Sequence, residues 1–482
     1  EADETSADAY KTVAALASSS GGSFFARAET EALVDLAIGD LLLWSKLDSR
    51  RHVLGALGAV ASRVPAGALS QRAHAKIGEA LSGLLDGLSR KTPSSVANEV
   101  SLSASLGSET VSAMRLEESV AASRYYASLW RCAHLCASRD GARWPAPVVA
   151  SLAGRVRPFL SFGVESREST FFARGGGGEG ENSALGGDSS DASADKIVSS
   201  SSSARGYVPP HARDESYSDS DASDAETTGP SGSKRERGFG DRFGSSKVRA
   251  NACACVASLA RADPRGAHPF WTRLLPTSAA QYGATRTVKN KTPITLARVM
   301  LHDPSPRARA AAAAAVAQLF DAPASRQYLS AAETKLDSKT GLALRRVNFA
   351  SLSSTLGDLA VATHGALTHA VASEPALACV PSACKACAAL ADAAPFGKLP
   401  RNLLPDAALA AWRRISSLQA KSGTRLLPSS SGGPNEDPEF VSATVALLSA
   451  LAATLGAKGA PASFEDALSR DSGEDVFRES TT

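Results

Sequence analysis

The sequence is poor in aromatic residues, which make up 6% of its 482 positions, and it lacks the alternation of apolar and polar residues typical of strands. Sheets favour aromatic and β-branched side chains, whereas the abundant alanine suits closely packed helices. The composition therefore predicts an all-α fold. The length is too great for one core, so we expect several domains or an elongated repeat array.

The seven cysteines are an odd number without the spacing of a disulfide framework. This pattern indicates a reducing compartment, so we expect an intracellular protein, cytoplasmic or nuclear. Three cysteines and two histidines could supply metal ligands: Cys379, Cys384, Cys387, His364 and His369. The set lacks the two C-x2-C pairs of a typical zinc site, so buried structural cysteines are favoured here and at Cys132 and Cys136. We expect no metal and no cofactor.

The net charge of +3 is nearly balanced, and no apolar run approaches the ~18 to 20 residues of a membrane span. Both features argue against a membrane or nucleic-acid partner. The acidic first residues, without methionine, fit no signal peptide and indicate a fragment. The glycines at 175–178 lack the Gly-Lys-Ser/Thr of a phosphate loop, and no other pattern indicates catalysis. We expect no enzyme.

Residues 174–246 change abruptly to glycine, serine and acids, with 13 acidic against 8 basic residues. Such a segment buries too little apolar surface to order, so it is predicted to be a disordered linker. Ser216, Ser218 and Ser223 each have an acid three residues later, a pattern that an acidophilic kinase could use. An unmodified solubilising linker explains the same residues equally well.

The stretch KRERGFGDRFG at 234–244 interleaves basic and aromatic residues, and its candidate RNA contacts are Arg235, Arg237, Phe239, Arg242 and Phe243. Positive charge with stacking rings could bind single-stranded RNA. A solvated linker end is the favoured interpretation, because the chain holds only one such patch.

Apolar residues at three- and four-residue steps predict helices on both sides of the linker. They are expected at 29–44, 50–64, 68–90, 109–138, 147–162, 247–261, 293–302, 306–320, 345–373, 376–393, 406–420 and 438–455. KVRANACACVASL (247–259) aligns without gaps on RARAAAAAAVAQL (307–319), so that Arg249 corresponds to Arg309. Alanine or cysteine between the larger residues keeps both helices thin. The six alanines at 310–315 are therefore predicted to be packing surface.

The turn HDPSP places Asp303 and two prolines before the second of these helices. Arg307 and Arg309 then lie near the positive end of the helix dipole, where a cation fits poorly. Something must hold them there, and in stacked helices an aspartate in the turn can pair with an arginine of its own or the next unit.

The set Asp-Pro-Ser-Pro-Arg-x-Arg-x-x-Ala with an apolar continuation resembles the HEAT repeat, a helix pair that stacks into an α-solenoid. Over about residues 246–404 the sequence more specifically resembles plant and algal members of the HEAT repeat-containing protein 6 family. Five stretches carry this resemblance, in the same order as in that family: FWTRLLP (270–276), LARVMLHDPSPRARAAA (296–312), SRQYLSAAE (325–333), LGDLAVATHGALTHAV (356–371) and KACAALADAAPFGKL (385–399). Those proteins carry a domain of unknown function there. The resemblance implies repeat-structural roles for Asp303, Arg249 and Arg309.

The predicted organisation has five segments: a helical repeat segment at 1–173, the linker at 174–246, a HEAT-repeat domain at 247–404, a degenerate helical repeat at 405–472 and a disordered tail at 473–482. The function expected is a non-enzymatic scaffold that binds protein partners along a helical-repeat surface. The alternatives are a transport-receptor-like adaptor and an RNA-associated factor that uses residues 234–244.

Overall fold

The structure is a computed structural model that describes residues 2–19, 27–63, 69–90, 116–117, 119–139, 144–164, 244–281, 294–321, 323–334, 351–422 and 438–457, with the single positions 460 and 463. Every regular element in these ranges is helical, so the predicted all-α class is confirmed for the described part of the chain. The described residues belong to one compact unit, formed by residues 1–169 and 240–482. The five predicted segments stay predictions.

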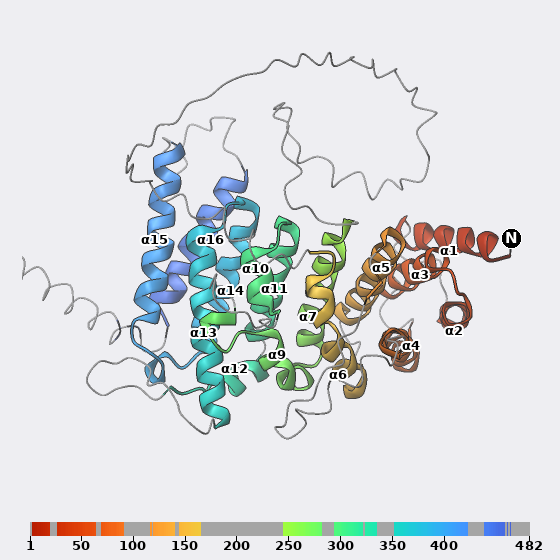
Figure 1. The fold of residues 1–482 in the computed structure, drawn as a ribbon, viewed down its shortest axis with the longest axis horizontal. Coiled ribbons are helices and arrows are strands. Elements are labelled where there is room, and N and C mark those ends of the chain that lie inside the picture. The colour runs from red at the N-terminus through yellow and green to blue at the C-terminus, as the bar shows by residue number, and fades with distance from the viewer. Residues whose placement is uncertain are drawn as a thin grey trace, which may run out of the picture. The chain divides into compact units, whose positions relative to one another are not determined.

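Figure 1 colours the helices in chain order. They are α1 (Ala2–Ser19), α2 (Arg27–Leu43), α3 (Leu47–Arg63), α4 (Gln71–Arg90), α5 (Val120–Ser138), α6 (Ala146–Arg155), α7 (Ser246–Ala262), α8 (Pro264–Ala267), α9 (Trp271–Leu274), α10 (Leu296–His302), α11 (Pro306–Asp321), α12 (Pro323–Leu329), α13 (Leu352–Ser373), α14 (Val380–Ala393), α15 (Leu403–Ser422) and α16 (Pro438–Leu455).

Most predicted helices are present within a few residues of their expected bounds. The helix predicted at 109–138 begins only at Val120, because the hydroxyl of Ser119 caps it by accepting the N–H of Ala122 at 3.1 Å. Helix α1 was missed. Its buried residues Ala7, Tyr10 and Ala17 are few and mostly small, so its apolar periodicity is weak.

One series of helices packs each against the next. We call it the central series, and its members in order are α1, α3, α5, α7, α11, α14 and α16. The helices between them flank the series and also contact one another, as α2 does with α4, α4 with α6, α10 with α13, and α13 with α15. Helices far apart in the sequence, such as α5 and α7, are therefore direct neighbours (Figure 1).

Small residues allow this close packing. In the alanine run of α11, Ala312, Ala313 and Ala315 are buried, whereas Ala314 is exposed. The run is therefore mainly packing surface, with one position open to solvent. The aligned helices α7 and α11 pack against each other and bury corresponding residues, including Val256 with Val316 and Leu259 with Leu319. The alignment made from the sequence thus matches the two buried faces.

Candidate functional site

Arg249 lies in the first turn of α7 with its side chain fully buried. Its Nε and Nη2 donate to the Asp303 carboxylate at 2.6 and 3.0 Å, while Nη1 donates to the Phe162 carbonyl at 2.9 Å and the Ser245 hydroxyl at 2.8 Å. Asp303 is the C-cap residue of α10, in the turn that leads to α11. The Asp303 carboxylate, bound by two hydrogen bonds, supplies the negative charge that stabilises the Arg249 cation at the positive end of the α7 dipole.

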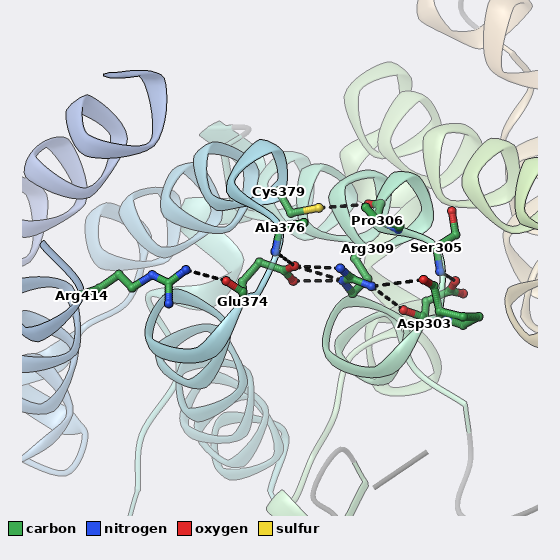
Figure 2. A network of polar contacts seen from close by, with 9 residues as sticks. Asp303, Ser305, Pro306, Arg309, Glu374, Ala376, Cys379 and Arg414 are labelled. Atoms are coloured by element: carbon green, nitrogen blue, oxygen red, sulfur yellow. Dashed lines mark hydrogen bonds and ion pairs between the residues drawn. The ribbon is translucent and has the colours of Figure 1, made fainter. Parts of the chain in front are cut away.

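Arg309 occupies the corresponding place in α11 (Figure 2). It makes the corresponding bonds to the next interhelical turn, which follows α13. Its Nε and Nη2 donate to the Glu374 carboxylate, with the closest contact at 2.8 Å, and its Nη1 donates to the Asp303 carbonyl at 2.7 Å. Each arginine therefore binds a carbonyl of a preceding turn and a carboxylate of the next.

Asp303 and Glu374 also play corresponding parts in their turns. Each is the C-cap of one helix, precedes a proline, and accepts the backbone N–H two residues later, from Ser305 at 2.8 Å and Ala376 at 2.9 Å. Arg414 of α15 donates to the Glu374 carbonyl at 2.7 Å, as Figure 2 shows.

We call this set the arginine ladder: Arg249, Asp303, Arg309, Glu374 and Arg414. The sequence singled out the first three and missed the other two. The dipeptide Glu374-Pro375 was the available signal, because it repeats Asp303-Pro304. The side chains of the two ion pairs are at most 9% exposed, so these pairs join helices and offer no surface to a ligand.

All seven cysteines are buried, and none is joined in a disulfide. Burial raises the pKa of Cys384 to about 12 and that of Cys387 to about 11, so both remain thiols at neutral pH. Burial also lowers the pKa of His364 to about 4, which keeps this imidazole neutral beside Phe396. Within the described ranges no group of His, Cys, Asp and Glu has the arrangement of a metal site.

Helices α5, α7, α11 and α14 of the central series each carry one stripe of partly exposed residues, and these stripes together are the exposed side of the central series. Side-chain bonds join neighbouring stripes: Asn251 of α7 donates to the Ala127 carbonyl of α5 at 2.9 Å, and Arg261 of α7 donates to Gln318 of α11 at 2.9 and 3.0 Å. The stripes of α5, α7 and α11 therefore form one continuous surface.

This surface is basic. Its charged residues on α5, α7, α11 and α14 include six cations, which we call the basic face: Arg124, Arg131, Lys247, Arg261, Arg307 and Lys385. Helices α5 and α7 contain no acidic residue at all. The acids Asp321 and Asp392, near the ends of α11 and α14, are paired with Arg326 at 3.5 and 2.7 Å. Among the described residues of α5, α7, α11 and α14, cations therefore outnumber acids on this surface.

A hollow of about 460 Å³ opens beside the basic face where α1, α3 and α5 meet. Arg63 and Arg131 line it, and its other walls are small or apolar residues such as Ala14, Gly58 and Ser128. The hollow extends the accessible surface of the series toward α1 and adds an exposed cation, Arg63.

Helix α16 has the length and composition of a membrane span, which corrects the expectation that no segment would. Core helices of soluble proteins pass the same test, and α14 and α15 pack against this one. The opposite side of α16 exposes Val441, Val445, Leu448 and Leu455.

Two predicted sites lie outside the described residues. They are the phosphorylation candidates Ser216, Ser218 and Ser223, and the RNA-contact candidates Arg235, Arg237, Phe239, Arg242 and Phe243. Both stay predictions.

Residues 247–425 match the model of a domain of unknown function, DUF4042. The match covers just over a third of the chain, from the start of α7 to the segment after α15, and includes the whole arginine ladder. Searches of curated proteins and of solved structures found no match.

Proposed function

We propose that the protein is a HEAT-type α-solenoid that serves as a non-enzymatic scaffold, binding protein partners along the exposed side of the central series. Serial packing supports the solenoid, because each helix of the series contacts the next while flanking helices contact one another. Such stacks of helix pairs give extended binding surfaces.

The observation that carries the proposal is the arginine ladder. Arg249 and Arg309 occupy the same position in two aligned helices, and each pairs with an acid that ends a flanking helix, Asp303 or Glu374. The same contact in successive turns is what a structural repeat produces. The ladder favours HEAT-type repeats, whose resemblance was carried by the same Asp-Pro and arginine positions.

A binding role is supported by where the polar groups lie. The ladder and the buried cysteines lie between helices, whereas the cations of the basic face are exposed or partly exposed. Seven buried cysteines without a disulfide also fit the cytoplasm or nucleus, and we propose that the scaffold acts there.

Affinity purification of the intact chain from cells, with quantitative mass spectrometry and a nuclease-treated sample, tests the proposal. We expect at least one nuclease-resistant protein at near-stoichiometric level. Partners that disappear with nuclease would instead favour the RNA-associated alternative, and the absence of any stoichiometric partner would contradict the scaffold.

A further inference from the structure

We propose that the basic face binds an extended acidic peptide segment of a protein partner. The inference rests on the proposed scaffold function and names the chemistry of its ligand. Its first support is charge, because six cations lie on four consecutive helices of the series, two of which contain no acid. Complementary charge of this kind steers encounter and fixes register.

The spacing of the helices provides a second support. Arg124, Lys247, Arg307 and Lys385 stand near the beginnings of α5, α7, α11 and α14, one cation per helix. Packed helices lie about 8 to 10 Å apart, and an extended chain advances roughly 3.3 Å per residue. One helix therefore corresponds to about three residues of peptide. A ligand with an acid at every third position would meet successive cations.

Small side chains line the surface between the cations. Ala127 and Ser128 of α5, Ala254 of α7 and Ala311 and Ala314 of α11 are partly or fully exposed there. A floor of such residues lets a peptide backbone approach the helices closely, so that its acidic side chains can reach the arginines and lysines on either side.

A peptide is favoured over single-stranded nucleic acid because the surface offers no stacking rings. Proteins that bind single strands without sequence preference stack the bases on aromatic side chains. The aromatic residues of α5, which are Tyr125, Tyr126 and Trp130, are all at most 2% exposed, and Phe320 of α11 is fully buried. The basic face on these helices therefore supplies charge without rings.

The test uses fluorescence anisotropy with the full chain and a labelled peptide of about twelve residues that carries aspartate at every third position. Two probes of equal length serve as controls: one with asparagine in place of aspartate, and a single-stranded RNA. We expect the aspartate peptide to bind at least about tenfold more tightly than the asparagine peptide. The difference should shrink as salt shortens the screening length from about 10 Å at 0.1 M to about 3 Å at 1 M.

Charge reversal locates the site. We expect the combination Arg131→Glu, Arg307→Glu and Lys385→Glu to weaken peptide binding by at least about tenfold. The matched control reverses three basic residues elsewhere, Arg265→Glu, Lys398→Glu and Arg401→Glu, and should bind as the unaltered chain does. If the reversed chain loses its circular dichroism signal, the glutamine versions of the same three positions provide the comparison.

Three results would overturn the inference: equal binding of both peptides, unchanged binding after charge reversal, or preference for the RNA probe. Each can be told apart from failure of the scaffold. If the affinity purification finds a protein partner whose recovery is unaffected by charge reversal, the scaffold stands and the acidic ligand does not. If no partner is found at all, the proposed function fails as well.

Discussion

Asp303→Asn removes one charge from an ion pair inside the protein, and we expect it to lower the free energy of unfolding by about 3 to 5 kcal/mol. The side chains of Arg249 and Asp303 are 0% and 2% exposed. The substitution leaves the guanidinium buried without its counter-ion. The asparagine oxygen can still accept the Ser305 N–H, so the turn keeps this hydrogen bond. The loss in free energy of unfolding therefore measures the effect of removing the charge.

A matched control is present on the surface. Lys76 approaches both carboxylate oxygens of Asp35 at 2.6 and 2.8 Å, as closely as Arg249 approaches Asp303, but these side chains are 37% and 55% exposed. Asp35→Asn makes the same chemical change in water, where such a pair contributes less than about 1 kcal/mol. The difference between the two variants isolates the effect of burial.

Urea unfolding followed by circular dichroism measures both variants. Because repeat arrays can open in parts, hydrogen exchange of the amides in α7 and α11 shows whether the loss is local to the ladder. Arg249→Met completes a double-mutant cycle, in which the double variant should cost less than the sum of the singles. If Asp303→Asn destabilises no more than Asp35→Asn, or if the cycle is additive, the buried pair does not hold these helices together.

Three further perturbations follow from packing and burial. Gly357→Ala should lower the melting temperature, because the added Cβ would meet the backbone of Glu333. Gly83→Ala, in open space on α4, should stabilise the protein by roughly 0.5 to 1 kcal/mol. A Gly357→Ala variant more stable than the Gly83→Ala variant would contradict the packing of α13. His364 takes up a proton in the unfolded chain near its ordinary pKa of 6.5 but in the folded chain only near about 4, so stability should fall by about 3 kcal/mol as pH drops through that window. His364→Gln should reduce this loss in urea titrations at several pH values, and an unchanged pH dependence would contradict it. The seven cysteines should resist a thiol reagent at neutral pH until urea unfolds the chain, whereas rapid labelling of the native protein would show that they are not buried.

The helices and the alanine-rich packing surface could be predicted because both are local. Both the 3.6-residue periodicity and the gapless alignment of 247–259 on 307–319 depend only on residues close together in the sequence. The partner of Arg309 could not be read in the same way. Glu374 lies 65 residues after Arg309. The helix that follows Glu374 has no arginine in its first turn, so the Asp-Pro and arginine pattern of the repeat is not complete there.

The basic face was beyond prediction for a different reason. Its cations occur singly between positions 124 and 385, separated by long stretches that include the linker, and no local charge cluster marks them. They gather only because α5, α7, α11 and α14 pack side by side. The sequence instead indicated a candidate basic site at 234–244, because the residues of that stretch are adjacent in the chain.

Photo-crosslinking from Ala314 tests whether protein partners bind along the exposed side of the central series. Ala314 is exposed in the middle of this surface, between α7 and α14, and a photoreactive amino acid there replaces only a methyl group. Ser330, exposed after α12, provides the control position. We expect a protein partner to be captured in cells from position 314 and not from position 330. Capture from 330 alone, or of RNA from 314, would contradict it.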